Sequence, residues 1–306
     1  DVFIFAPALE VAEAKKISAL EVFGYKDEEN PWSIISKIIE KKSWNTRKWA
    51  IEMNFLTVER FEKLKESFLT SDFSTDITNK IQYMMLIKSE DEIAKMIEAG
   101  KWADFALEVG FAAIKEEVSE SEIVAQIEYE LKKNGIRQMS FDTLVLIGDH
   151  AASPHGEPGN RKLKRNELVL FDLGVVYNGY TSDVTRTVAY GEVSEFEKEI
   201  YQIVLEANEA AIAAIKPGVT AGELDGIARK VITDAGYGEY FIHRLGHGLG
   251  STVHEYPSIM SGSDLVIEEG MCFSIEPGIY IPEKVGVRIE DCVYVTKTGC
   301  EILTHT

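Results

Sequence analysis

Residues 168–187 decide the fold, and they read Leu168-Val-Leu-Phe-Asp172-Leu-Gly-Val-Val-Tyr177-Asn-Gly-Tyr180-Thr-Ser-Asp183-Val-Thr-Arg-Thr187. The first ten residues form an apolar run that contains a single carboxylate. The dipeptide Asn178-Gly179 after such a run is the strongest short signal for a two-residue β-hairpin turn. In that hairpin Tyr177 pairs with Tyr180, and this pair sets the register of both strands.

Two carboxylates share one face of the predicted hairpin. Asp172 faces Thr185, and Asp183 lies two residues from Thr185 on the same face, so the two aspartates are diagonal neighbours about 7–8 Å apart at Cα. Without a partner they would repel each other and raise each other's pKa, whereas a divalent cation between them removes that cost. The alternative is a solvated sheet face, which the apolar neighbouring positions disfavour. We therefore predict a metal site on this hairpin.

Three of the six histidines fall within twelve residues, at positions 243, 247 and 254. His247 stands between two glycines, which allow backbone and ligand to approach closely. A lone histidine in such a place is more often a buried core residue, but three beside small residues favour a cluster for metal ligation and proton transfer. The spacing is not HExxH, which excludes the helical zinc-protease motif.

Two further acids complete the candidate set. Glu276 ends an apolar strand before a Pro-Gly turn. Another strand, expected over residues 287–295, places Arg288 and Glu290 on one face and Asp291 on the other. A surface ion pair between Arg288 and Glu290 is the competing interpretation. Four carboxylates and one imidazole carry about −4 charges, which two divalent ions balance, and such an oxygen-rich set suits Mn²⁺ or Co²⁺.

The larger part of the chain contains an internal repeat. Ala-Ala-Ile-Lys at residues 112–115 recurs at residues 213–216, an offset of about 101 residues. Ser119-x-x-Glu122 and Thr220-x-x-Glu223 are capping boxes at matching places in the two copies. Chance similarity of amphipathic helices is the alternative, but the ungapped register favours a domain of two α/β halves related by a pseudo-twofold axis.

The amino-acid composition argues against several classes of protein. Of 306 residues, 45% are apolar and 27% charged, the balance of a globular protein long enough for one large domain and a smaller one. The formal net charge of −19 argues against a nucleic-acid partner. Three cysteines without a CxxC argue against a disulfide framework. No apolar run has the length of a membrane span, so we expect no membrane association and a cytoplasmic location.

Residues 1–77 are expected to form the smaller α/β unit. Asn30-Pro31 has the pattern of a helix N-cap followed by proline at the first helical position. The segment 71–79 is rich in Ser, Thr, Asp and Asn and is expected to be a linker. Because the chain opens within a strand-like run and its first methionine is Met53, we expect Asp1 to lie inside a domain rather than at its beginning.

Together these motifs resemble those of the Xaa-Pro dipeptidase (prolidase) and aminopeptidase P family of metallopeptidases. The resemblance covers residues 86–306, and residues 1–77 resemble part of the family's N-terminal domain. It implies an α/β (α+β) architecture: a partial creatinase-like N-terminal domain over 1–77, then a pita-bread catalytic domain over 86–306. The motifs that carry it are Phe171-Asp172 with Asp183, Gly246-His247-Gly248 with His254, Ile275-Glu276-Pro277-Gly278 and Val287-Arg288-Ile289-Glu290-Asp291.

The resemblance also implies roles for individual residues. It implies two divalent ions, foremost Mn²⁺, with Co²⁺ or Zn²⁺ as alternatives. His254, Glu276 and His155 are the implied catalytic residues, with Glu276 relaying a proton while it remains a ligand. His155, His243 and Arg288 are implied to contact substrate, although Arg288 has the alternative role of holding a ligand carboxylate. The implied metal ligands are Asp172, Asp183, His247, Glu276 and Glu290.

The resemblance implies hydrolysis of the bond before proline in Xaa-Pro dipeptides, by an enzyme that we expect to be a homodimer. The nearest alternative is aminopeptidase P, which releases the residue before proline from longer peptides. A non-catalytic binding protein on the same fold is a remote alternative, since such proteins usually lose metal ligands. Methionine aminopeptidases and creatinase fit less well, the first for lack of the N-terminal domain and the second for lack of the metal ligands.

Overall fold

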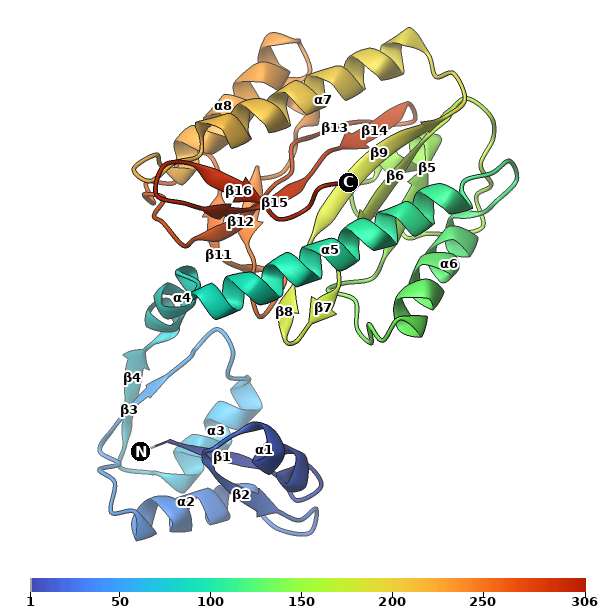
Figure 1. The fold of residues 1–306 in the computed structure, drawn as a ribbon. Helices are drawn as coiled ribbons and strands as arrows, with labels where there is room; N and C mark the ends of the chain where they lie inside the picture. Colours follow the sequence, from blue (N-terminus) through green and yellow to red (C-terminus); the bar gives the residue numbers. More distant parts are fainter. Residues whose placement is uncertain (1) are drawn as a thin grey trace. The chain divides into compact units, whose positions relative to one another are not determined.

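The computed structural model describes residues 2–306, and the chain divides into two compact units, Asp1–Ile81 and Gln82–Thr306. Unit 1 alternates strands and helices, and its strands pair in parallel, β1 with β2 and β3 with β4 (Figure 1). No helix among residues 2–306 is both long and apolar enough to cross a membrane. The elements of unit 1 are β1 (Phe3–Pro7), α1 (Val11–Ile17), β2 (Glu21–Tyr25), α2 (Pro31–Lys41), β3 (Lys48–Ile51), α3 (Val58–Ser67) and β4 (Asp72–Asp76).

The linker expected over residues 71–79 is wrong, because Asp72–Asp76 form strand β4. Phe73 is its buried residue and packs against the rings of Trp49 and Phe61. The other side chains of β4 are exposed, so their Asp, Ser and Thr composition imitates that of a loop. The strand is held by this buried aromatic side chain and by its parallel ladder with β3.

Unit 2 consists of two similar halves, and its strands lie between the helix pairs α5–α6 and α7–α8 (Figure 1). After α4 (Thr78–Leu86), the first half contains α5 (Glu90–Ala113), α6 (Glu120–Lys133), β5 (Leu144–Ile147), η1 (Gly148–Ala152), β6 (Glu167–Leu173), β7 (Val176–Tyr177), β8 (Tyr180–Thr181) and β9 (Val184–Tyr190). The second half contains α7 (Glu195–Ala214), α8 (Ala221–Asp234), η2 (Gly238–Tyr240), β10 (Gly246–Gly248), β11 (Glu255–Ile259), β12 (Cys272–Ile275), β13 (Gly278–Ile281), β14 (Val285–Arg288), β15 (Asp291–Val295) and β16 (Cys300–Ile302).

The predicted repeat is confirmed by the helices of unit 2. The two longer helices end at Ala113 and Ala214, and the next two are capped by Ser119 and Thr220, with the same offset as the sequence repeat. Both caps form the complete capping box that the sequence predicts. Each half also has its own apolar core between its helix pair and its strands.

The hairpin of the first half has the predicted register, with Asp172 opposite Thr185. Asn178 and Gly179 have φ values of 47° and 83°, as a two-residue turn with positive φ at both positions requires. The ladder is interrupted after Leu173 and resumes where β7 pairs with β8. Asp183 lies in this interruption, immediately before β9.

The second half contains a similar interruption. β12 pairs with β15 as far as Ile275 and Asp291, and β13 pairs with β14 from Gly278 and Arg288 onward. The single strand expected over residues 287–295 is therefore wrong: the chain passes from one sheet to another between Arg288 and Asp291. We call these two interruptions the ladder breaks. Alternation of side chains cannot reveal such a break, because both flanking segments keep their strand pattern.

The glycines beside His247 allow neighbouring backbone segments to approach β10 closely. A Cβ atom on Gly246 would lie 1.9 Å from the Ser274 carbonyl oxygen, and one on Gly248 would lie 2.4 Å from that of Tyr256. By contrast, a Cβ on Gly226, within α8, would meet no atom within 4 Å.

We expect Gly246→Ala to lower the free energy of unfolding of the metal-free protein by about 1–3 kcal/mol, because β10 must move away from β12. Gly226→Ala, the matched control in a helix, should raise it by about 0.5–1 kcal/mol. Denaturant unfolding followed by circular dichroism measures both. Equal stabilities would show that the close approach of the two backbones is not a constraint.

Candidate active site

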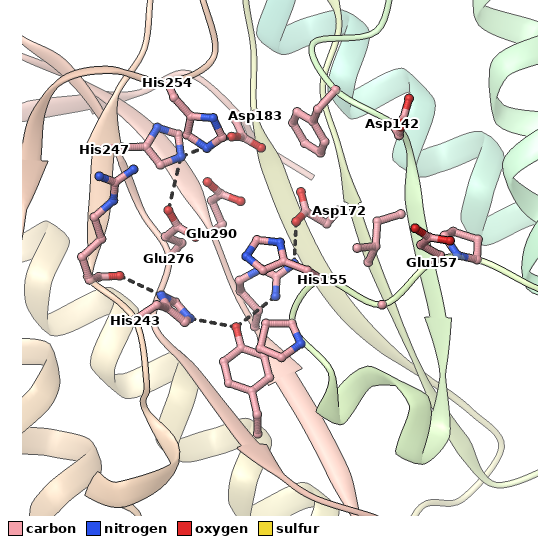
Figure 2. A pocket seen from close by; sticks show the side chains of 18 residues that line it. Asp142, His155, Glu157, Asp172, Asp183, His243, His247, His254, Glu276 and Glu290 are labelled. Carbon is pink, nitrogen blue, oxygen red and sulfur yellow. Dashed lines mark hydrogen bonds and ion pairs between the residues drawn. The ribbon is translucent and has the colours of Figure 1, made fainter. Parts of the chain in front are cut away.

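One pocket of about 490 Å³ in unit 2 contains all nine residues that the sequence predicts for the site. Figure 2 labels all of them except Arg288 and shows the labelled side chains converging on the pocket from both halves. The nine residues are His155, Asp172, Asp183, His243, His247, His254, Glu276, Arg288 and Glu290. The predictions were made from separate segments of the sequence, and the fold brings these segments together.

Three of the predicted ligands form the centre of the site. Asp183, His247 and Glu290 each place one ligand atom within 4.8 Å of the others, and all three side chains are buried. The Glu276 Oε1 atom lies 3.3 Å from His247 Nε2, and an Asp183 oxygen lies 3.6 Å from the same nitrogen. The Ser274 hydroxyl holds this edge, because it donates to Glu276 and accepts from the backbone N–H of His247.

The ladder breaks explain why these side chains meet. Asp183 lies in the first break, and Glu276 and Glu290 lie in the second, one on each arm. Across the halves, the Glu290 N–H donates to the Thr185 carbonyl oxygen, and the Thr185 hydroxyl donates to the Glu290 carboxylate at 2.7 Å. Each half therefore contributes carboxylates to a single cluster.

His247 is a neutral imidazole with a free lone pair. Burial lowers its pKa to about 4. The ring donates from Nδ1 to the Gly248 carbonyl oxygen at 3.1 Å, so the Nε2 lone pair points toward the carboxylates. A lone pair that faces anionic oxygens is repulsive unless a cation lies between them.

The carboxylates of the site also outnumber its cationic side chains. Burial, together with the neighbouring acids, raises the pKa of Asp183 and of Glu290, and burial raises that of Glu276 to about 7. Buried oxygens of Asp172, Asp183 and Glu290 have no hydrogen-bond partner among the described residues. Since buried polar atoms are otherwise almost always satisfied, these orphaned oxygens and the histidine lone pair fit a divalent cation.

Arg288 is the buried cation of the site, and three protein groups occupy its guanidinium. It donates from Nη2 to Asp172, from Nη1 to the Tyr280 hydroxyl at 2.9 Å, and from Nε to the Thr185 hydroxyl at 3.2 Å. Only 4% of the residue is exposed. These contacts match the alternative in which Arg288 holds a ligand carboxylate.

Tyr280 is a pocket residue that the sequence analysis missed. Burial raises its pKa to about 12, so its hydroxyl remains protonated. His243, whose pKa burial lowers to about 4, donates from Nδ1 to the Arg244 carbonyl oxygen and accepts at Nε2 from this hydroxyl at 2.9 Å. The signal was present, since a tyrosine inside an apolar strand needs a partner for its hydroxyl.

The two exposed histidines lie on loops that buried charges hold in place. His155 belongs to a loop anchored by Glu120, a fully buried side chain that accepts from the N–H groups of Ile147 and Gly159. His254 precedes Glu255, whose ion pair with Lys88 is buried, and the His254 ring lies 4.3 Å from that of His247. Both loops can thus present a histidine at a defined place on the pocket wall.

Arg244 is a second cation that the sequence analysis missed. It lines the pocket and is exposed. Among the residues that the structure describes, only its Nη1 donates to a protein group, the Ser258 hydroxyl at 2.8 Å. No spacing rule distinguishes Arg244 from other exposed arginines, because its position depends on the loop before β10.

Comparison with known proteins places the two units in one family. Residues 94–297 match metallopeptidase family M24, and residues 1–84 match the creatinase/prolidase N-terminal domain. An Xaa-Pro dipeptidase of Lactobacillus delbrueckii subsp. lactis is 54% identical over 307 aligned positions, which cover 99% of this chain and 83% of that protein.

Solved structures agree with the sequence matches. The prolidase of Pyrococcus furiosus superposes with a TM-score of 0.91 at 41% identity, covering 99% of this chain and 87% of that one. An X-Pro aminopeptidase of Thermotoga maritima also gives 0.91, at 34% identity, covering 99% and 85%. The expected pita-bread fold with a creatinase-like N-terminal domain is confirmed, and the chain belongs to metallopeptidase family M24.

Proposed function

We propose that this protein hydrolyses the peptide bond before proline in Xaa-Pro dipeptides, with two divalent metal ions as cofactors. The observation that carries the proposal is the set of buried carboxylate oxygens without partners around a neutral imidazole. The similarity to the Lactobacillus Xaa-Pro dipeptidase supports the choice of substrate.

Asp172, Asp183, His247, Glu276 and Glu290 would hold the ions, with Mn²⁺ favoured over Co²⁺ or Zn²⁺ by the excess of carboxylate oxygen. When bound, the ions polarise the scissile carbonyl and lower the pKa of a water nucleophile. The Glu276 carboxylate accepts the proton that this water loses. The Ser274 hydroxyl orients that carboxylate by donating a hydrogen bond to it. His254, at the exposed rim, donates a hydrogen bond to the developing oxyanion or protonates the leaving imino nitrogen.

The contacts of the pocket distinguish the predicted substrate-binding residues. His155 is exposed on the pocket wall and free to contact the peptide near the scissile bond. Both ring nitrogens of His243 already have partners, so we propose that it orients Tyr280. Each guanidinium nitrogen of Arg288 has a protein partner as well, and we propose that Arg288 orients Asp172.

Arg244 then becomes the candidate for the carboxylate of a dipeptide's proline. Its guanidinium has donors without protein partners and lies at the pocket that the predicted ligands line. Arginine suits this task because its planar fork can bind a carboxylate through two parallel hydrogen bonds. A free carboxylate next to the scissile bond exists in a dipeptide but not in a longer peptide, so this contact would favour dipeptides.

Aminopeptidase P activity remains the alternative, since one similar structure is that of an X-Pro aminopeptidase. Comparing kcat/KM for an Xaa-Pro dipeptide and an Xaa-Pro-Yaa tripeptide with added Mn²⁺ tests the choice. We expect the dipeptide to be preferred. Preference for the tripeptide would assign aminopeptidase P activity, and cleavage of neither would leave the remote alternative, a binding protein.

We also propose a cytoplasmic homodimer. Unit 1 exposes several large apolar side chains, surface of the kind that protein contacts cover. They are Leu9, Ile17, Phe55, Val58 and Leu69. Light scattering after size exclusion measures the mass directly.

Asp183→Asn should abolish turnover and lower the bound Mn²⁺ per chain, because it removes one charge from the centre of the ligand cluster. Asp291→Asn is the matched control, since Asp291 is also buried but pairs with Arg186 at 2.6 Å outside the pocket. Elemental analysis and activity measure both effects. Equal losses of metal in the two variants would contradict the assignment.

Arg244→Met should reduce kcat/KM for Xaa-Pro about ten- to a hundredfold, the effect of losing a charge-assisted contact of about 1.5–3 kcal/mol. It should change kcat/KM for Xaa-Pro-amide much less, because the amide has no carboxylate. Arg288→Lys should harm both substrates equally, since it disturbs Asp172. A loss confined to the dipeptide in Arg288→Lys would instead assign the carboxylate contact to Arg288.

A further inference from the structure

Helix α7 buries an apolar stripe that contains one polar side chain. The buried residues of this helix are Ile200, Ile203, Val204, Ala207, Asn208 and Ala211. Asn208 is 2% exposed, so the fold removes an amide from water among aliphatic neighbours. Such burial is costly unless the amide makes specific hydrogen bonds.

The amide of Asn208 bridges the two strands of the second ladder break. Its Nδ2 donates to the carbonyl oxygen of Ile275 at 3.0 Å and to that of Ile289 at 3.3 Å. Each acceptor immediately precedes an acid of the site, Glu276 on one arm of the break and Glu290 on the other. One side chain therefore spans the break, with a hydrogen bond to each of its two arms.

The repeat shows that the fold itself does not need an asparagine here. The matching position on α5 is Leu107, which is fully buried in the core of the first half. In that half the ladder break is bridged by the Ser140 hydroxyl, which lies 2.9 Å from the Val175 carbonyl oxygen and 2.8 Å from that of Ser182. Both breaks are thus spanned by a polar side chain from another segment. In the second break this side chain is Asn208, which belongs to helix α7.

We propose that Asn208 is a positioning residue for the metal site, which sets the spacing of the Glu276 and Glu290 carboxylates by clamping the backbone before each. The inference rests on the proposed function only in taking these two acids as metal ligands. It does not depend on the identity of the peptide substrate.

The test is Mn²⁺ binding to metal-free protein, measured by calorimetry and by the electron paramagnetic resonance of free Mn²⁺. Asn208→Leu installs the residue that the first half has at the matching position. Asn208→Ala is the second variant, because the smaller side chain fits the same space even if leucine prevents folding. Gln202→Leu, on the exposed side of the same helix, is the matched control. We expect Mn²⁺ affinity to fall about 10–100-fold in the Asn208 variants and to remain unchanged in the control.

Thermal unfolding of the metal-free proteins shows whether Asn208 only stabilises the core or positions the two acids. If Asn208 only supports the core, its variants unfold at a lower temperature but bind Mn²⁺ as wild type does, and the proposal is overturned. If the clamp positions the acids, the folded variants bind Mn²⁺ weakly whatever their melting temperature. Weak binding combined with a wild type that cleaves no Xaa-Pro peptide would support the clamp while contradicting the proposed substrate.

Discussion

The structure depends on one electrostatic constraint, the confinement of carboxylates within a few ångströms of one another and away from water. Asp183 and Glu290 are each less than 5% exposed, and among residues 2–306 the one arginine buried to the same degree is Arg288, which holds Asp172. Burial and mutual repulsion would keep part of this cluster protonated in the absence of a cation. Three side chains hold these acids in place against that repulsion: Thr185 holds Glu290, Ser274 holds Glu276, and Arg288 holds Asp172.

The backbone accommodates the constraint by interrupting its own sheets. Within the second break, Glu290 leaves its own ladder and donates its N–H to the Thr185 carbonyl oxygen, and this bridge joins the two halves at the carboxylate cluster. At each ladder break the two arms stop pairing for a few residues and then resume in the same register, and a side chain supplies hydrogen bonds there: Ser140 in the first half and Asn208 in the second. The apolar cores on either side supply the stability that permits these interruptions.

Much of this arrangement was predictable, because it follows from local rules. The turn at Asn178-Gly179 sets the register that opposes Asp172 to Thr185, and the capping boxes reveal the repeat. Contacts between distant segments were not predictable. Periodicity gives no sign that residues 287–295 divide between two sheets, that Tyr280 links His243 to Arg288, or that Asn208 reaches two carbonyl groups. The edge strand β4 was missed because its exposed positions carry the residues of a loop.

The division of the cluster between the halves has a consequence for folding. Asp172 and Asp183 come from the first half, and His247, Glu276 and Glu290 from the second, so neither half offers a complete site by itself. Any ion held by both sets acts as a cross-link whose strength depends on its concentration: a ligand at a hundred times its dissociation constant contributes about 2.7 kcal/mol to stability. With a cation held by both sets, the melting temperature would rise with the concentration of that cation, and a chelator would lower it.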